Sequence, residues 1–364
     1  MKRKSLTVAV TTLAAAAAIS LLLPAAPSGA CSTFCLDSGA GPVFGKNYDW
    51  DVPDGLVIVN KRGVEKRGLT EDNPARWTSV YGSVTFNQYG REMPCGGMNE
   101  AGLVIELMWL DETEYPLPDA RPSLQNLQWI QYHLDLSVTV ADVIAGEGDI
   151  RIVRDEQARV HFLVADSSGA CAAVEFVGGE MMVHTGDTMP AAVLTNDTYE
   201  RSASFLATHE GFGGTAPVPL SRYSLDRFVR AAAAVSEYEP DAGSDTAEYA
   251  FGILGSVAQG EATQWSIVYD LRARRIGFRT WANPAVRTVD FGLLDFDCVS
   301  PVLVLDIDAG VSGDVTGEFE PYTTAANRRL VESAFRKTRF LAGASASVVD
   351  HIASFPDTTP CANK

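Results

Sequence analysis

Apolar and polar positions recur with different periods along the chain, and each period predicts a different element. Short apolar or alternating runs bounded by turn residues predict strands at 31–36, 42–48, 56–61, 84–88, 102–110, 160–165, 172–177, 181–184, 192–195, 265–271 and 275–280. Longer runs with helical spacing predict helices at 123–136, 138–146, 199–208, 225–235, 246–257 and 325–342. Strands on both sides of a helical pair are typical of a layered α+β domain.

Turn and loop signals separate these runs. The tetrapeptide Gly39-Ala-Gly-Pro42 predicts a tight turn that returns the second strand antiparallel to the first, and the polar turn 272–274 predicts another hairpin. The glycine pairs 96–97 and 213–214 are interpreted as ordinary turn glycines. Residues 111–122 hold four acidic residues and three prolines, which indicates a surface loop and a candidate cover for an active site.

The first thirty residues have the pattern of a cleavable signal peptide. A basic tripeptide at 2–4 precedes an apolar run at 6–23, and prolines and the small residues Ser28-Gly-Ala30 follow. We therefore expect residues 1–30 to be removed and residues 31–364 to form one domain, exported to the periplasm or secreted. Cleavage after Ala30 leaves Cys31 with a free α-amine beside its thiol. Such a residue combines a nucleophile with a base, because an α-amine titrates near roughly 7.7–8.

Three other interpretations of Cys31 are open from this junction alone. The first is a lipoprotein, whose cysteine is acylated, although Ser28 stands where an aliphatic residue is usual. The second is a cysteine that forms a structural disulfide, which export permits. The third is an uncleaved anchor, because the apolar run has about the minimum length for a membrane span.

Composition narrows the partners of the mature chain. The formal charge is −17, and removal of Lys2, Arg3 and Lys4 makes it −20. An acidic surface repels nucleic acid and anionic lipid, so we expect no nucleic-acid partner and no membrane contact after cleavage. No cofactor or metal is expected either. The five histidines are scattered, and the sequence has no zinc spacing, phosphate loop, dinucleotide fingerprint or serine elbow.

The six cysteines are Cys31, Cys35, Cys95, Cys171, Cys298 and Cys361. With Cys31 as a nucleophile, the other five form at most two disulfides, whose pairing the sequence does not reveal.

Several polar and charged residues stand at ends of predicted elements, where they could form a site around Cys31. Asp49 follows the second predicted strand, Asn196 ends a short apolar strand, and Arg227 and Arg230 start an apolar helix. Each also has a plain structural interpretation, as a solvated strand end, a turn or a helix surface.

Six motifs occur together and in order after the signal junction. They are Cys31, Phe44-Gly-Lys-Asn-Tyr-Asp49, Gly97-Met-Asn-Glu-Ala-Gly-Leu103, Val193-Leu-Thr-Asn196, Arg227-Phe-Val-Arg-Ala231 and Thr263-Gln-Trp-Ser-Ile-Val-Tyr-Asp-Leu271. In this order the chain resembles the choloylglycine hydrolase family of N-terminal-nucleophile hydrolases, which includes bile salt hydrolases and penicillin V acylases. The resemblance covers most of the mature chain.

The resemblance implies a four-layer αββα sandwich of two antiparallel sheets and hydrolysis of linear amide C–N bonds. It implies that Cys31 forms a thioester and that its own α-amine is the base, with Asp49 and Arg227 as positioning groups. It implies oxyanion donation by the Asn196 side chain and by the backbone N–H of Trp109. Asn99 is interpreted as structural, and the family implies a homotetramer.

Two departures from the family pattern bear on the substrate. Lys46 stands where the family commonly has Arg, which keeps the charge but loses the bidentate fork. Trp109 and Trp50 would offer flat apolar faces beside the thiol, or pack in the core. The first expectation is a small N-acyl amide substrate, penicillin V-like or an N-acyl homoserine lactone, and conjugated bile salts are the alternative. An inactive exported binding or scaffold protein with the same fold is the alternative of a different class.

Overall fold

The fold was analysed in a computed structural model, which describes residues 30–240 and 245–362. The predicted signal peptide lies outside the described residues, except for Ala30. Within the described ranges, no helix is both long enough and apolar enough to span a membrane.

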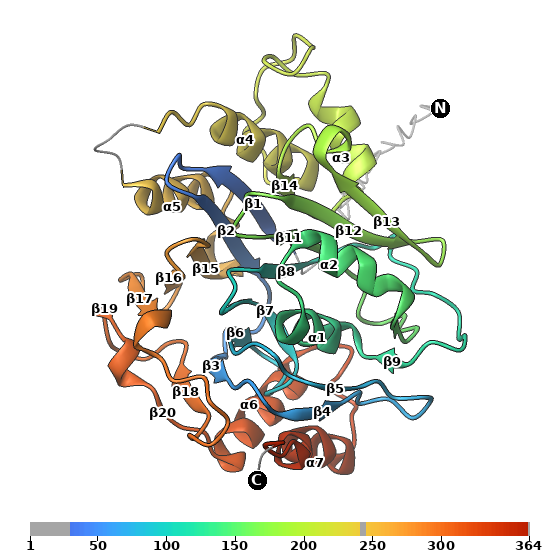
Figure 1. The fold of residues 1–364 in the computed structure, drawn as a ribbon. Helices are drawn as coiled ribbons and strands as arrows, with labels where there is room; N and C mark the ends of the chain where they lie inside the picture. The colour runs from blue at the N-terminus through green and yellow to red at the C-terminus, as the bar shows by residue number, and fades with distance from the viewer. Residues whose placement is uncertain (1–29, 241–244, 363–364) are drawn as a thin grey trace, which may run out of the picture.

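Two large sheets form the centre of the molecule (Figure 1). The seven-stranded sheet has the order β14 (Val193–Leu194), β1 (Ser32–Asp37), β2 (Pro42–Asp49), β15 (Thr263–Asp270), β16 (Arg275–Thr280), β17 (Arg287–Asp290) and β19 (Gly313–Asp314). The nine-stranded sheet has the order β13 (Glu180–Thr185), β12 (Cys171–Val177), β11 (Val160–Ala165), β8 (Val104–Trp109), β7 (Pro94–Asn99), β6 (Ser83–Asn87), β3 (Leu56–Asn60), β18 (Leu303–Asp306) and β20 (Glu320–Pro321). Neighbouring strands are antiparallel except for the pair β17–β19. Two small sheets join β4 (Glu65–Arg67) to β5 (Arg76–Thr78) and β9 (Ser123–Leu124) to β10 (Arg151–Ile152).

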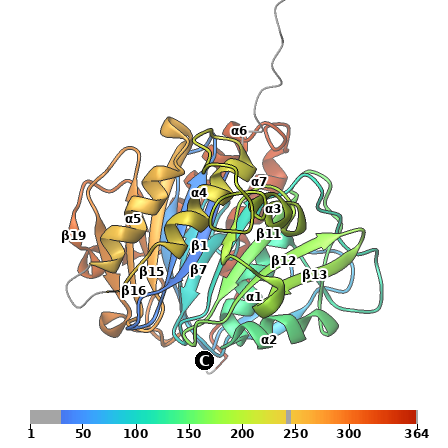
Figure 2. The same ribbon diagram turned by 90° about the horizontal axis from the view of Figure 1, so that it is seen from above.

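Helices cover the outer face of each sheet. α4 (Ser224–Ser236) packs on β1 and β14, and α5 (Thr246–Ser256) packs on β2 and β15. α1 (Asn126–Leu136) packs on β7 and β8 of the other sheet, and Figure 2 shows the sheets between these helical layers. The remaining helices are α2 (Val140–Ala145), α3 (Tyr199–Leu206), α6 (Thr324–Lys337) and α7 (Ala346–Ser354). The expected α+β fold of four layers is confirmed.

β2 is buried along its whole length because a helix covers one face and the second sheet covers the other. Its alternating side chains therefore reach two different interiors. Asn47 binds the α5 carbonyl of Leu254 with its side-chain amide, on the helical side. Lys46 and Tyr48 point between the sheets, where Tyr48 donates a hydrogen bond to Gln88 at 3.0 Å. One strand thus delivers polar groups to both sides of the central sheet.

The Lys46 ammonium is fully buried between the sheets. It binds the Leu107 carbonyl, and it lies 3.9 Å from a carboxylate oxygen of Glu106. The other Glu106 oxygen accepts a hydrogen bond from the Tyr269 hydroxyl at 2.5 Å. A Cβ at Gly96 would come within 2.1 Å of this carboxyl group, so only glycine fits there. The buried carboxylate therefore explains a glycine in the middle of a strand.

Several predictions of local structure need correction. The turn interpretation of the glycine pair 96–97 is wrong, because both residues lie in β7, where Gly96 makes room for the Glu106 side chain and Gly97 for the backbone of β6. The helix predicted at 325–342 ends at Lys337, after which Thr338 is extended. The helix predicted at 123–136 begins only at Asn126, because Ser123 and Leu124 pair with β10. The hairpins β1–β2 and β15–β16 are confirmed.

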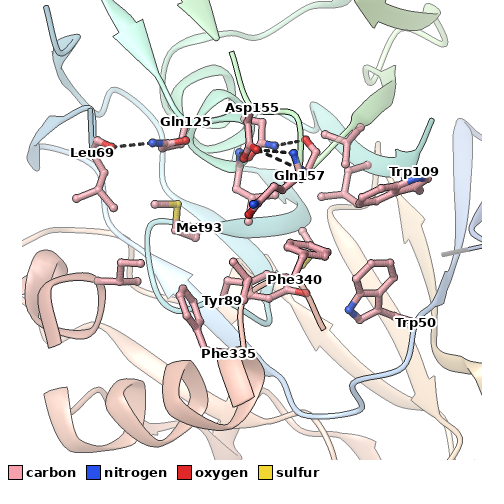
Figure 3. Close-up of a pocket in the computed structure, with 18 of the residues that line it drawn as sticks. Trp50, Leu69, Tyr89, Met93, Trp109, Gln125, Asp155, Gln157, Phe335 and Phe340 are labelled. Atoms are coloured by element: carbon pink, nitrogen blue, oxygen red, sulfur yellow. Dashed lines mark hydrogen bonds between the residues drawn. The ribbon is translucent and has the colours of Figure 1, made fainter. Parts of the chain in front are cut away.

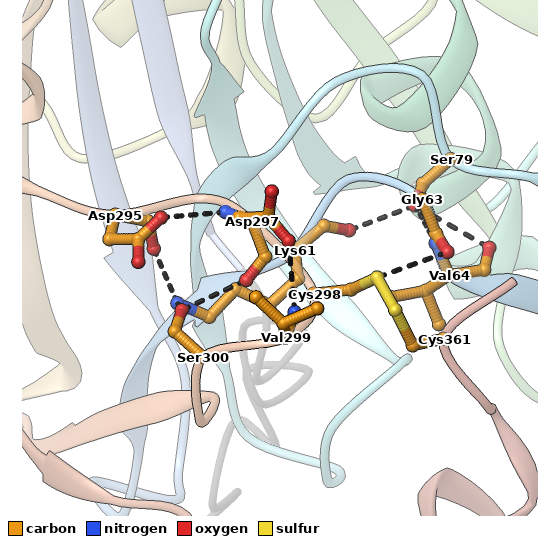
Figure 4. The surroundings of a disulfide bond; sticks show 10 residues. All are labelled: Lys61, Gly63, Val64, Ser79, Asp295, Asp297, Cys298, Val299, Ser300 and Cys361. Atoms are coloured by element: carbon orange, nitrogen blue, oxygen red, sulfur yellow. Dashed lines mark hydrogen bonds between the residues drawn. A yellow bond between two sulfur atoms is a disulfide. The ribbon is translucent and has the colours of Figure 1, made fainter. Parts of the chain in front are cut away.

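The C-terminal region, which contains the unpredicted helix α7, is fastened to the body of the protein. α6 and α7 pack against each other, and the Asn327 side chain of α6 donates to the Ala353 carbonyl of α7 at 2.8 Å. A disulfide joins Cys298 to Cys361 across 63 residues (Figure 4). Backbone hydrogen bonds also tie the segment around Cys361 to the chain at Gly63 and Glu65. A disulfide of this span typically stabilises a fold by about 2–4 kcal/mol.

Glu106 is expected to make stability depend on pH. Burial raises its pKa from 4.5 to about 7, against the charge of Lys46 and the Tyr269 hydrogen bond. The folded state therefore keeps a proton that the unfolded chain releases, and the resulting stability, complete below pH 4.5, is lost as pH rises through 7. Glu106→Gln should abolish this slope, which is roughly 1.4 kcal/mol per pH unit. Denaturant unfolding across this pH range measures it, and the exposed Glu112→Gln is the control. Parallel curves for Glu106→Gln and wild type would contradict the prediction.

Candidate active site

Cys31 lies directly before β1 at the end of the central hairpin. Its side chain is 2% exposed. The thiol is 3.9 Å from the Asp49 carbonyl, a weak contact, and it faces a cavity between the two sheets. Burial raises the pKa of the thiol, and the charge of Lys46 is the largest opposing effect. A thiol in this environment needs a base to become a nucleophile.

Arg227 connects the residues around Cys31. Its Nη1 donates to the Cys31 carbonyl and to the Ser32 hydroxyl, both at 2.6 Å. Its Nη2 donates to Asn196 Oδ1 at 2.7 Å, and its Nε donates to the Arg222 carbonyl at 3.1 Å. The guanidinium thus holds three separate segments of the chain through one planar group. Arg230, its neighbour on α4, instead binds the carbonyls of Pro219, Ser221 and Ser256, away from Cys31.

The Asn196 side chain has a defined orientation. Because Arg227 donates to its oxygen, the amide nitrogen must point the other way, where it donates to the Trp109 carbonyl at 2.8 Å. The Asn196 backbone N–H donates to the Ser224 hydroxyl at 2.8 Å. An amide nitrogen carries two hydrogens, so one remains for a further acceptor. The predicted residues Asn196, Trp109, Arg227 and Cys31 are therefore brought together.

Asp49 lies at the end of β2 and is buried on the helical side of the sheet. Its Oδ1 accepts a hydrogen bond from the Thr263 hydroxyl at 2.5 Å, while its Oδ2 has no hydrogen-bond partner among the described residues. Burial raises the pKa of Asp49 to about 6, and the charge of Arg227 is the largest effect that opposes the shift. An unpartnered buried carboxylate oxygen is costly, so this atom marks a position for a donor.

Lys46 also belongs to the surroundings of Cys31, but its contacts are with Leu107 and Glu106. The amine acts on the thiol through its charge, which lowers the pKa of Cys31. Asn99 has the expected structural role, because its amide binds the carbonyls of Leu134 and Ser137 below α1.

A cavity of about 420 Å³ opens beside Cys31 (Figure 3). Trp50 and Trp109 lie at one end, with ring centroids 5.9 Å apart, and both line it as predicted. Phe340 completes an aromatic cluster, at 6.5 Å from Trp50 and 6.1 Å from Trp109. This volume is in the range of pockets that hold a small organic ligand.

Sequence reasoning missed much of the cavity lining. Phe340 lies in the stretch predicted as helix, and no local signal there indicates a binding residue. The predicted cover at 111–122 does not line the cavity; several of its residues line a second, smaller and more polar cavity. Among the described residues, no group of three or more His, Cys, Asp or Glu side chains is placed to hold a metal ion.

Comparison with known proteins is consistent across sequence and structure. Residues 31–304 match the family model described as linear amide C–N hydrolases, choloylglycine hydrolase family. The penicillin V acylase of Pectobacterium atrosepticum is 27% identical over 359 residues, which cover 85% of this chain and 95% of that protein.

Solved structures give the same result. The penicillin V acylase from Agrobacterium tumefaciens superposes with a TM-score of 0.72 at 27% identity, covering 80% of this chain and 98% of that one. A variant of the conjugated bile acid hydrolase from Clostridium perfringens has a TM-score of 0.64 at 17% identity, covering 76% and 97%. At 17% identity, the second likeness concerns the fold alone.

Arg227→Lys should strongly reduce turnover at this site. A lysine has no planar fork, so it cannot hold Cys31, Ser32 and Asn196 at once. We expect kcat to fall by roughly 10²–10³, the usual cost of an impaired oxyanion donor, with a smaller change in KM. Arg230→Lys on the same helix is the matched control, with thermal unfolding as a check on folding. Equal effects of both substitutions would contradict the bridging role of Arg227.

Proposed function

Because the chain belongs to the choloylglycine hydrolase family of linear amide C–N hydrolases, we propose that it is an exported N-acyl amide hydrolase whose nucleophile is the N-terminal thiol of Cys31. The observation that carries the proposal is the convergence of Arg227, Asn196 and Asp49 on Cys31 at the end of an apolar cavity. The hydrolase acts on C–N bonds in linear amides, other than peptide bonds.

Removal of residues 1–30 would create the base that the buried thiol needs. The free α-amine of Cys31 would take the thiol proton, and the sulfur would attack the amide carbonyl carbon. Collapse of the tetrahedral intermediate would break the C–N bond, with the proton returned from the ammonium group to the leaving amine. Water, deprotonated by the same amine, would then attack the thioester and release the acid together with the Cys31 thiol.

Asp49 and Arg227 suit the positioning of this N-terminal residue. Arg227 fixes the Cys31 carbonyl. The charge of the Asp49 carboxylate raises the pKa of the Cys31 thiol, and the Oδ2 of this carboxylate has no hydrogen-bond partner among the described residues. An α-ammonium is a donor that would satisfy this oxygen. The Asp49 carboxylate would also stabilise the α-ammonium group that forms when the α-amine takes the thiol proton.

The oxyanion would be held by the Asn196 amide, whose nitrogen is already oriented by Arg227, and by the Trp109 backbone N–H. Preorganised donors of this kind stabilise the transition state without reorganisation. The positive charge of Lys46, buried between the sheets, would favour the Cys31 thiolate, because it opposes the rise in the pKa of the thiol.

The preferred substrates are penicillin V-like amides and N-acyl homoserine lactones. Trp50, Trp109 and Phe340 offer apolar faces beside Cys31, so binding energy would come from the acyl half. Two relatives at 27% identity are penicillin V acylases, which supports this choice. Conjugated bile salts are the second candidate. Homotetramer assembly stays an expectation from the family.

Export is supported by two features. The family match begins at Cys31, the residue after the predicted cleavage site. The Cys298–Cys361 disulfide suits the periplasm or the extracellular space, because cytosolic thiols are kept reduced.

Cys31→Ala should abolish hydrolysis while the protein stays folded, because Cys95, the other thiol among the described cavity residues, has no α-amine beside it. The panel is penicillin V, N-acyl homoserine lactones, and glycine- and taurine-conjugated bile salts, with Cys35→Ala as the control. We expect turnover of the first two classes. Turnover of bile salts alone would refute the aromatic-pocket argument.

Retained activity in Cys31→Ala would refute the assignment of Cys31 as the nucleophile. A thiol probe separates the remaining alternative: if Cys31 reacts no faster than the other cysteines, the result would favour an inactive binding protein.

Asn196→Ala should lower kcat by roughly 10²–10³ with little effect on KM, because the lost hydrogen bond forms mainly in the transition state. Asp197→Ala is the neighbouring control, since that carboxylate pairs with Arg201 at 2.9 Å instead. Steady-state kinetics on the best panel substrate decide the question. A rise in KM at unchanged kcat would mean that Asn196 serves substrate binding alone.

A further inference from the structure

One side of the cavity is built by a part of the chain that the family model does not include. The match ends at residue 304, whereas the C-terminal wall of the cavity comes from α6, α7 and the segment between them. The side chains of this wall are Phe335, Phe340, Leu341, Ala344, Val348 and Ile352.

The C-terminal wall reaches the nucleophile end of the cavity. Phe340 packs against Trp50 and Trp109 in the aromatic cluster beside Cys31, edge-on to Trp50 and tilted to Trp109. Figure 3 shows the cavity extending away from the two tryptophans toward Leu69 and Gln125, past Phe335. The C-terminal wall therefore lines the cavity from the end near Cys31, where the reacting carbonyl would lie, toward Leu69 and Gln125. An extended acyl group attached at Cys31 would lie along it.

The wall is held at several points rather than resting on the surface. Lys337 forms an ion pair with Asp54, and the Thr338 and Tyr89 hydroxyls are hydrogen-bonded at 3.1 Å. α7 is joined to α6 through Asn327 and Arg328, and the disulfide at Cys361 fastens the chain beyond it. A wall anchored at both ends can limit the length of a bound group.

The polar groups of the cavity suit an acyl chain without a terminal charge. Among the described residues that line the cavity, Asp155 alone carries a formal charge, and none is Lys or Arg. Asp155 accepts the backbone N–H groups of Gln157 and Ala158, and the Gln125 amide donates to the Leu69 carbonyl at 3.0 Å. The remaining free donors of the lining, the Trp50 indole N–H and the Gln157 amide, are neutral, so no described lining residue offers a cation to an anionic chain end, whose burial without a counter-charge is unfavourable.

We propose that the C-terminal wall sets the acyl specificity of the enzyme, so that the cavity selects extended apolar acyl groups with an uncharged end. This inference rests on the proposed function, because it assumes that the acyl half of the amide occupies the cavity. It assigns specificity to residues 335–352, outside the family match.

The test uses N-acyl homoserine lactones with butanoyl, octanoyl and dodecanoyl chains, which share one leaving group. Ala344→Trp fills the wall, and Ala342→Trp is the matched control, because Ala342 is exposed and does not line the cavity. Ala344→Trp should lower the dodecanoyl-to-butanoyl ratio of kcat/KM about ten-fold or more, and Ala342→Trp should leave this ratio unchanged. An amide of a dicarboxylic acid, adipoyl homoserine lactone, should be a poor substrate of the wild type.

Val348→Trp repeats the test at a cavity position that is 45% exposed and so tolerates a larger side chain. This variant replaces Ala344→Trp if that protein does not fold. A chain-length ratio that stays unchanged in the folded wall variants, or an adipoyl amide hydrolysed as well as the octanoyl amide, would overturn the proposal. Calorimetric binding of the same lactones to Cys31→Ala proteins provides a readout without catalysis. A wild type that hydrolyses neither this series nor penicillin V nor the conjugated bile salts would refute the proposed function, while the binding ratios would still support or overturn the role of the wall.

Discussion

The buried guanidinium of Arg227 is the group on which the arrangement of the site depends. It is 1% exposed, and each of its three nitrogens donates to an oxygen acceptor of the protein. Through these bonds α4 holds the start of β1 and the segment after β14, which are neighbours in one sheet. Burial lowers the pKa of the guanidinium, and the charge of Asp49 is the largest effect that opposes this shift. Removing one member of such a buried charged group leaves the others unpaired, so the site is organised as a unit.

The two faces of the central hairpin separate the tasks of this unit. On the helical side, Arg227 donates a hydrogen bond to the Ser32 hydroxyl, and the Thr263 hydroxyl donates one to Asp49. On the side between the sheets, Cys31 faces the cavity, and Lys46 contacts Glu106 and Leu107. Because side chains alternate along a strand, the Cys31 thiol lies on the cavity side of the hairpin, and the Ser32 and Asp49 side chains lie on the other. The buried thiol, whose pKa is raised, suits activation only after a neighbouring amine becomes free.

Much of this was accessible from the sequence, because the information is local. The signal junction singles out Cys31, the strand runs predict the hairpins, and the ordered motifs identify Asp49, Asn196 and Arg227. What the sequence concealed depends on tertiary contact. Gly96 looks like a turn glycine until Glu106 is found opposite it. Phe340 becomes a cavity residue through tertiary contacts, because the bonds of Lys337 to Asp54 and of Thr338 to Tyr89 hold the chain just before it. The pairing of Cys298 with Cys361 likewise follows from the fold and from no spacing rule.

We propose that Cys31 is the first residue of the mature enzyme and carries the acyl group during turnover. Intact-mass spectrometry of the exported protein, followed by peptide mapping after an acid quench during turnover of a slow amide substrate, tests it directly. We predict that the exported protein has the mass of a chain that begins at Cys31, and that a single acyl adduct lies on the peptide that contains Cys31. A mass that includes Ala30, a lipid attached to Cys31, or an acyl adduct on any other residue would contradict it.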